Sequence, residues 1–194
     1  MKESVMRHRP FLIHTILFLS GTVVVVSACG GPIETRTMTQ TAAPLPVQKQ
    51  YALSSNAEQN NVAYSKAREL TVSALGKYGF TENAAAPILV NIAIADRPAD
   101  MTITIGEEKS LQTLVTAKKS KALQSCADRE HRLTIIVVDK NGGELLYSGT
   151  AAEYHCKGTV NASLPYLVNG ALADLNSGTS PDIKNKLLIR NGLE

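Results

Sequence analysis

The sequence predicts an α+β fold, a two-layer sandwich in which two helices pack on one face of a mainly antiparallel sheet. Three observations lead to this prediction. One segment early in the chain and one late in the chain have the apolar spacing of helices, a β-branched run lies between them, and a long hairpin precedes the second helix. The 194 residues show no internal repeat, so the folded part fits one domain.

The first helix is predicted over residues 57–78. Ser55 and Glu58 have the spacing of a capping box, and Gly79 offers a left-handed stop. Five residues between them recur at helical intervals: Ala63, Ala67, Leu70, Ala74 and Tyr78. Because this stripe is rich in alanine, the helix is expected to pack closely against a sheet.

Shorter strands are predicted on either side of this helix. Residues 51–53 alternate as a first strand, and residues 88–95 are apolar on both faces, as in a covered strand that ends at residues 96–98. Residues 101–105 are expected to form another short strand. Residues 106–125 leave two interpretations open, a helical turn or a solvated loop.

The strongest structural pattern is a hairpin with strands at residues 131–139 and 144–154, turned by Asn141 and Gly142. Two registers are open. The first register pairs Asp139 with Glu144. The second register pairs Asp139 with Gly143, with Gly142 left-handed. This second register also sets Ile135 opposite Tyr147, Val137 opposite Leu145 and, without a bulge, Cys126 opposite Cys156.

The second helix is predicted after Ser163, its expected cap, with Pro165 tolerated in the first turn. Its apolar stripe follows the helical period up to Gly178, through Leu164, Leu167, Val168, Ala171, Leu172 and Leu175. After Pro181, the positions of Ile183, Leu187 and Leu188 predict a short amphipathic terminal helix.

Residues 1–28 resemble a bacterial lipoprotein signal peptide. A basic start (Lys2, Arg7, Arg9) precedes an apolar core that is short for a bilayer span, and the core ends in Val26-Ser27-Ala28-Cys29, which resembles a lipobox. The resemblance implies cleavage before Cys29 and a covalent diacylglycerol and acyl chain on it, with no other cofactor. Since Gly30 and not aspartate follows Cys29, the sorting pattern implies the outer membrane, with the domain facing the periplasm.

Residues 29–47 are predicted to be a lipidated flexible tether, because threonine and proline leave little to bury, and residues 48–194 to be the periplasmic domain. The whole chain has 20 basic and 17 acidic residues. Cleavage removes Lys2, Arg7, Arg9 and Glu3, which leaves a mature net charge of about +1. This balance gives no electrostatic basis for nucleic-acid binding.

A disulfide between Cys126 and Cys156 is predicted. The signal peptide directs the chain to an oxidising compartment, and lipidation of Cys29 leaves an even pair of cysteines.

No catalytic motif is present in the sequence: there is no Gly-x-Ser-x-Gly elbow, His-Glu-x-x-His pair or glycine-rich phosphate loop. The mature chain has two histidines, His131 and His155, near Asp128, Glu130 and Glu153 at the open end of the hairpin. The first register brings Asp128 opposite His155 and Glu130 opposite Glu153, a set that suits a divalent cation. Charged residues at strand ends more often face water, so no metal and no enzymatic activity are predicted. Tyr147 and Tyr154 are expected to be packing or edge residues.

One local concentration of positive charge remains as a candidate contact for lipid phosphates or an acidic partner. It consists of Lys109, Lys118, Lys119 and Lys121.

The domain resembles a family of small envelope lipoproteins that carry an uncharacterised domain. The resemblance covers residues 51–178 and rests on Gly79-Phe80, the strand at 88–95, Asp139 before Asn141-Gly142, Tyr147-Ser148-Gly149, and the helix at 164–175. Here tyrosine stands where tryptophan is usual, and the cysteine pair is an addition. The resemblance implies a fold and a location, with no established activity.

The predicted function is therefore a non-enzymatic, outer-membrane-anchored lipoprotein that binds or scaffolds an envelope protein through the open sheet face or the segment 106–125. Two alternatives are an accessory lipoprotein of a lipid or lipopolysaccharide transport system, by analogy of architecture, and a metal-dependent envelope enzyme.

Overall fold

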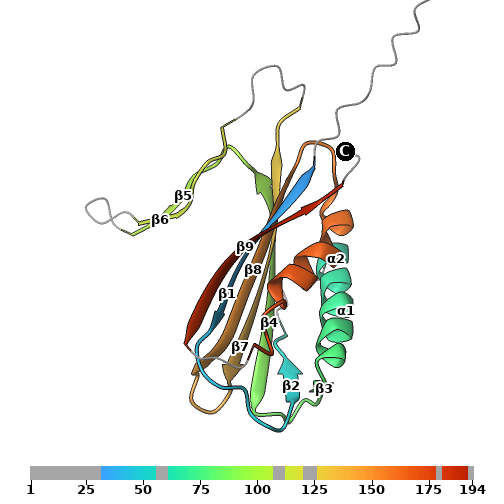
Figure 1. Cartoon of the computed structure of the whole chain (residues 1–194), viewed down its shortest axis with the longest axis vertical. Coiled ribbons are helices and arrows are strands. Elements are labelled where there is room, and N and C mark those ends of the chain that lie inside the picture. Colours follow the sequence, from blue (N-terminus) through green and yellow to red (C-terminus); the bar gives the residue numbers. More distant parts are fainter. Residues whose placement is uncertain (1–31, 56–60, 107–111, 120–125, 178–180, 192–194) are drawn as a thin grey trace, which may run out of the picture.

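The computed structural model describes residues 32–55, 61–106, 112–119, 126–177 and 181–191. These residues form a seven-stranded sheet in the order β3-β2-β4-β7-β8-β1-β9, a separate β5-β6 pair and two helices (Figure 1). The elements are β1 (Ile33–Thr41), β2 (Gln50–Leu53), α1 (Val62–Lys77), β3 (Thr81–Glu82), β4 (Ile88–Pro98), β5 (Ile103–Ile105), β6 (Gln112–Val115), β7 (Arg129–Asp139), β8 (Leu145–His155), α2 (Val160–Ala171) and β9 (Asp182–Arg190).

The α+β class is confirmed, but the sheet is mixed rather than mainly antiparallel. β2 runs parallel to both β3 and β4, whereas the pairs β4-β7, β7-β8, β8-β1 and β1-β9 are antiparallel. The parallel pairs follow from α1, because a helical crossover returns the chain to the same end of the sheet and makes the next strand parallel. In Figure 1, α1 and α2 lie side by side along the sheet, and α2 packs against β1, β7 and β8.

The first helix begins later than predicted. Its cap is Asn61, whose side-chain oxygen accepts a hydrogen bond from the Tyr64 amide at 2.8 Å. The predicted partner Glu58 lies outside the described residues. The end of the helix agrees with the prediction, since Gly79 has a φ of +84°. Ala67 and Ala74 of the predicted stripe are buried, and α1 packs against α2 and β4.

Residues 33–41, predicted to be tether, form β1 instead. Four threonines at alternate positions are buried on one face of this strand: Thr35, Thr37, Thr39 and Thr41. Threonine is β-branched and favours strands, and its hydroxyl can be buried when it finds a partner. Because β1 pairs with β8 and β9, the folded part begins at about residue 33 rather than at residue 48.

The predicted terminal helix is also wrong, because residues 182–190 form the strand β9. All nine of its residues pair with β1, from Asp182 opposite Thr41 to Arg190 opposite Ile33. Leu187 and Leu188 follow Ile183 by four and five residues. This spacing alone does not distinguish a helix from a strand. The unpaired side of β1 decides the outcome, since a strand there satisfies the backbone groups of both segments.

The hairpin adopts the first register only at its turn. The Asp139 amide donates to the Glu144 carbonyl at 2.9 Å, but a bulge between Val137 and Val138 then shifts the pairing. Tyr147 therefore lies opposite Val137 and not opposite Ile135 as the second register required. The left-handed residue of the turn is Gly143, with a φ of +69°, and not Gly142.

The second helix begins before the predicted cap. Thr159 accepts a hydrogen bond from the Ala162 amide, and α2 starts at Val160. Pro165 therefore lies inside the helix and not in its first turn, at the cost of one helical hydrogen bond. The predicted apolar stripe is confirmed, because all six of its residues are at most 1% exposed: Leu164, Leu167, Val168, Ala171, Leu172 and Leu175.

The strands β5 and β6 form an arm that extends away from the sheet in Figure 1. The strand predicted at residues 101–105 is β5, and β4 continues through Pro98. In the segment 106–125, residues 112–115 form β6, which is neither the helical turn nor the loop that we expected. Among the described residues, no helix combines the length and hydrophobicity needed to cross a bilayer.

Candidate functional site

The predicted disulfide joins Cys126 to Cys156, with 5.6 Å between the two Cα atoms. The register argument for it was wrong, since Arg129 and not Cys126 approaches this end of β8, opposite His155. Both cysteines lie beyond the paired strands, where the chain is free to turn and bring the two sulfur atoms together. The bridge closes the open end of the hairpin.

Beneath this bridge lies a buried polar cluster, which consists of His131 on β7, Glu153 and His155 on β8, and Ser163 on α2. The Ser163 Oγ atom lies 2.9 Å from Nδ1 of His131 and 3.0 Å from Nε2 of His155. The two imidazole rings stack with 4.9 Å between their centroids. Glu153 Oε2 lies 2.8 Å from His155 Nε2, so the four side chains form one connected network.

Glu153 is held ionised within this network. Burial raises its pKa, but hydrogen bonds from His155, Thr35 and Arg190 outweigh this effect and lower the pKa to about 2. The Arg190 Nη2 atom lies 2.9 Å from Glu153 Oε2 and connects β9 to the cluster. Burial lowers the pKa of His131, and the neighbouring His155 lowers it further, which favours the neutral imidazole.

The residue types of the polar cluster match those of an acyl-transfer triad, but their arrangement does not. In such a triad the serine and the carboxylate bind opposite nitrogens of the histidine ring. Around His131, Ser163 lies at Nδ1, but the carboxylate on the other side, Asp96, is 3.8 Å from Nε2 and therefore beyond hydrogen-bond distance. Around His155, Ser163 and Glu153 both approach the same nitrogen, Nε2. Both side chains are also completely buried, with 0% exposure, so substrate has no access to them. The cluster's direct effect is to join β7, β8 and α2.

The expectation that these charged residues face water is wrong. Glu130, His131, Glu153 and His155 are all at most 4% exposed. The bulge in β7 also separates the predicted pairs, so that Glu130 lies opposite Tyr154 and His131 opposite Glu153. In the part of the chain that the structure describes, no group of three or more histidine, cysteine, aspartate or glutamate side chains is placed to hold a metal ion.

Glu130 lies on the sheet face opposite to this cluster, within a group of cations. Arg97 and Arg132 both form ion pairs with its carboxylate. Beside it, the ring of Tyr154 has Lys118 at 4.6 Å and Arg36 at 5.4 Å from its centroid. These contacts neutralise the buried carboxylate and fix the base of the arm.

The predicted lysine surface is only partly described. Lys109 and Lys121 lie outside the described residues. Lys118 forms an ion pair with Asp128 at 2.7 Å in addition to its contact with Tyr154, so its charge is already compensated. Lys119 is exposed. Tyr147 is a packing residue, as predicted: it is fully buried, and its hydroxyl donates to the Ala171 carbonyl at 2.7 Å.

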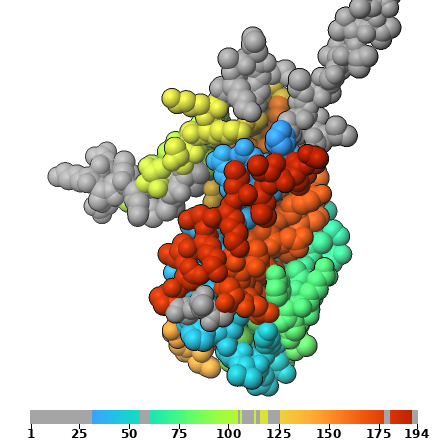
Figure 2. Space-filling model, viewed as in Figure 1, coloured from blue at the N-terminus to red at the C-terminus, as the bar shows by residue number. Residues whose placement is uncertain are grey.

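The most exposed large hydrophobic side chains near one another lie on β9 and the adjacent β1. We call them the apolar edge: Met38, Ile183, Leu187, Leu188 and Ile189, which are between 46% and 65% exposed. Figure 2 shows β9, in red, across the surface of the molecule. The sequence analysis assigned three of these residues to an amphipathic helix and therefore did not recognise the surface.

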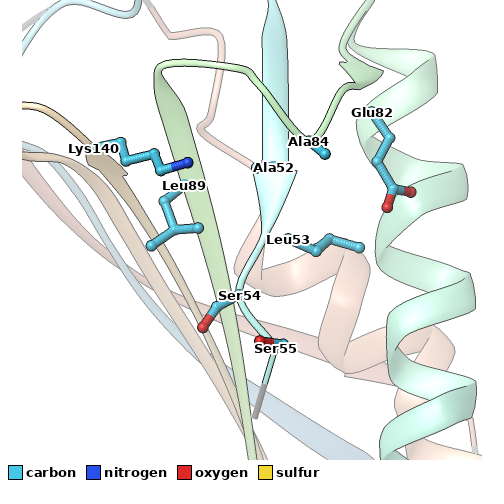
Figure 3. Close-up of a pocket in the computed structure, with 8 residues that line it drawn as sticks. All are labelled: Ala52, Leu53, Ser54, Ser55, Glu82, Ala84, Leu89 and Lys140. Atoms are coloured by element: carbon cyan, nitrogen blue, oxygen red, sulfur yellow. The ribbon is translucent and has the colours of Figure 1, made fainter.

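A surface hollow of about 380 Å³ lies around β2, near the opposite end of the strand order from β9 (Figure 3). Its lining combines small and apolar side chains with two charged ones, Glu82 and Lys140. In Figure 3 these two charges come from opposite sides of the hollow, Lys140 from the β7-β8 turn and Glu82 from β3 next to α1. This arrangement lacks the convergent polar groups of a small-molecule site.

No family model matches the chain, and no curated protein sequence matches it. Among solved structures, the chain is similar to a PDZ domain protein from Parabacteroides distasonis, with a TM-score of 0.50 and 12% identity over 79% of this chain. The similarity spans 39% of that protein's length and shows the fold alone. A PelC dodecamer from Paraburkholderia phytofirmans is similar at a TM-score of 0.46 and 14% identity, over 72% of this chain and 96% of that chain. This second similarity is too low to carry an argument.

Proposed function

We propose that the protein is a non-enzymatic lipoprotein of the bacterial outer membrane, anchored through lipid on Cys29, that binds or scaffolds another envelope component through the apolar edge. The lipobox-like run before Cys29 supports the anchor. Ser163 and Glu153 belong to the buried polar cluster, whose residue types are those of a catalytic triad. Their full burial keeps substrate from reaching them, which favours a binding role over a catalytic one.

The apolar edge is the observation that carries this proposal. An edge strand presents unpaired backbone groups, and soluble proteins usually keep such strands short or polar. β9 is nine residues long and exposes four large aliphatic side chains. Contiguous exposed apolar surface of this kind marks interaction sites.

The chain also places this edge near the proposed anchor. Ile33, the first residue of β1, lies opposite Arg190 of β9 and is four residues from Cys29. Four residues span at most about 14 Å. We also propose a two-layer arrangement of helices on the sheet, in which the Arg190 end of the edge is held close to the membrane.

The experiment is crosslinking in intact cells, followed by affinity purification of the lipidated protein and identification of the attached component. We expect a reproducible envelope complex that is lost when Leu187→Lys and Ile189→Lys place charges on the edge. The control is Val62→Lys, which adds one charge of the same kind at a more exposed aliphatic position, 78% exposed, at the start of α1. A protein that is recovered as an uncrosslinked monomer, or a complex that survives the edge variant, contradicts the proposal.

A further inference from the structure

We propose that the occupant of the apolar edge is the apolar edge of a second copy of this chain, paired antiparallel about a two-fold axis at Lys186. This inference rests on the proposed function and names its partner. Within the described ranges, β9 pairs with β1 on one side and with no strand on the other. In a symmetric contact between two β9 strands, the same surface patch serves both copies, and the unpaired backbone groups of each strand bind those of the other.

The charges at the two ends of β9 are complementary in this register, whereas Lys186 on the axis lies opposite its own copy. With Lys186 on the axis, each residue of β9 has a partner in the second copy, and Asp182 of one copy lies opposite Arg190 of the other. Opposite charges across an antiparallel pair stabilise it. The dimer therefore gains two such pairs, one at each end of the paired strands.

The apolar side chains match in the same register. Ile183 lies opposite Ile189 of the second copy, and their side chains share one face. That face is the exposed one, because the cross-strand neighbours of Ile183 and Ile189 are Gln40 and Glu34, whereas the alternate threonines of β1 are buried. On this face Leu187 lies opposite Asn185 of the second copy, so the apolar side chains of both copies lie on the same side of the paired strands, with Met38 one strand inward on each side.

The neighbouring registers are worse. In a symmetric antiparallel pair, the two-fold axis passes where one residue lies opposite its own copy. The alternative registers therefore differ by moving the axis by whole residues along β9. An axis at Asn185 places Lys184 opposite Lys186 of the second copy. An axis at Leu187 places Lys184 opposite Arg190. Like charges directly opposite destabilise a strand pair. Each alternative contains two like-charge pairs and no Asp182–Arg190 pair, whereas the proposed register contains one like-charge pair, Lys186 with its copy, and two opposite-charge pairs, so the proposed register is favoured.

Lysines on an edge strand normally discourage pairing, but here they are engaged within their own copy. The Lys186 Nζ atom lies 2.7 Å from Asp174 Oδ1, and Lys184 lies 3.0 Å from Asp182 and 3.8 Å from Asp174. Their charges are compensated on the face that carries the threonines. Pairing of the backbone edge leaves these contacts in place.

Cysteine crosslinking in membranes from cells that produce the full chain tests the register. Opposed residues in antiparallel strands have Cα atoms about 4.5 to 5.5 Å apart, a distance that suits a disulfide. We expect Lys186→Cys to form a covalent dimer on mild oxidation, above the level given by the unsubstituted chain. The matched control is Lys184→Cys, on the same face of the same strand, because the two copies of residue 184 lie about 14 Å apart in this register.

A charge test accompanies the crosslink. In the Lys186→Cys chain, Asp182→Arg removes both end pairs, and we expect the dimer to weaken by about 2- to 30-fold. Adding Arg190→Asp restores the opposite charges and is expected to recover part of the yield. Stronger dimers at Asn185→Cys or Leu187→Cys than at Lys186→Cys overturn the register and the inference.

Failure of this inference is distinguishable from failure of the proposed function. If Lys186→Cys crosslinks to a protein of a different mass, the edge binds a different partner; the inference fails and the proposed function stands. If no crosslink forms and affinity purification recovers the protein alone, both fail.

Discussion

Gly149 of β8 is the position where one added methyl group should damage the fold most. A Cβ atom at Gly149 would lie 1.8 Å from the Ala171 carbonyl oxygen and 3.0 Å from Cε1 of Tyr147. Ordinary contact begins at about 3.4 Å, so the end of α2 must retreat by more than about 1.5 Å. Ala171 is fully buried and its carbonyl accepts the Tyr147 hydroxyl at 2.7 Å, so little room exists for this movement.

The magnitude follows from these two contacts. Overpacking in a filled core costs about 1 to 3 kcal/mol, and a buried hydroxyl that loses its acceptor costs about 1 to 3 kcal/mol more. We therefore expect Gly149→Ala to lower the free energy of unfolding by about 2 to 6 kcal/mol. For a domain of this size, that corresponds to a fall in melting temperature of at least about 4 °C.

The assay is urea denaturation and thermal melting followed by circular dichroism, with Gly142→Ala as the matched control. A Cβ at Gly142 meets no atom within 4 Å, so this variant should differ from wild type by less than about 1 kcal/mol. If Gly149→Ala unfolds within about 0.5 kcal/mol of the control, the close approach of β8 to α2 is not rigid, and the reasoning from this contact is wrong.

Four further predictions test the turn, the bridge, the buried carboxylate and the anchor. Gly143→Val should lower stability by more than about 1 kcal/mol, because a φ of +69° disfavours a β-branched residue, whereas Gly142→Val should have a smaller effect; equal melting temperatures would contradict this. Replacing Cys126 and Cys156 together with serine should cost about 3 to 4 kcal/mol through loss of loop closure, and unchanged urea midpoints would count against it. The pKa of Glu153 falls from 4.5 to about 2 on folding, so its contribution of about 3 kcal/mol is present above pH 4.5 and is lost as the pH falls toward 2. Glu153→Gln should flatten the dependence of unfolding free energy on pH in that window, and an unaltered slope would refute the assignment. Cys29→Ala should leave an unlipidated precursor, which intact mass measurement would reveal, and normal maturation of this variant would refute the lipid anchor.

Those elements that carry a strong local pattern could be predicted from the sequence. The six apolar residues predicted for the second helix recur at helical spacing, and all of them are buried, although α2 ends at Ala171 and leaves Leu172 and Leu175 in the turns that follow. The β7-β8 hairpin has a turn signal between two β-branched runs. The glycine of Tyr147-Ser148-Gly149, which entered only as part of a family resemblance, now has a physical reason: no side chain fits between β8 and the Ala171 carbonyl.

The strands β1 and β9 were not predicted. The threonines at alternate positions of β1 were a usable strand signal, which the threonine- and proline-rich composition of residues 29–47 obscured, whereas β9 has no such pattern. β1 is threonine-rich like a tether, and β9 mixes lysines with aliphatic residues in no strict alternation. Each becomes a strand because the other lies beside it. Their contact joins segments far apart in the chain, such as Thr37 and the Lys186 carbonyl at a separation of 149 residues. Local periodicity contains no information about such a partner.

The buried polar cluster was missed for a related reason. Glu153 and His155 are two residues apart on one strand, so they share a face, and this spacing was a usable signal. The sequence alone did not reveal that α2 covers that face and brings Ser163 between the two histidines. The one-residue shift at the β7 bulge then decided which charged residues oppose one another.

Arg190 connects the buried polar cluster to the apolar edge. Its guanidinium binds Glu153 at 2.9 Å and stacks 3.7 Å from the centroid of Tyr166 on α2, so one end of the outermost strand is fixed to the core by a charge-assisted bond. Glu153 stays ionised at neutral pH because several donors surround it, and Arg190 is one of them. The position of β9, and with it the surface that we propose for binding, therefore depends on a carboxylate that the sheet buries.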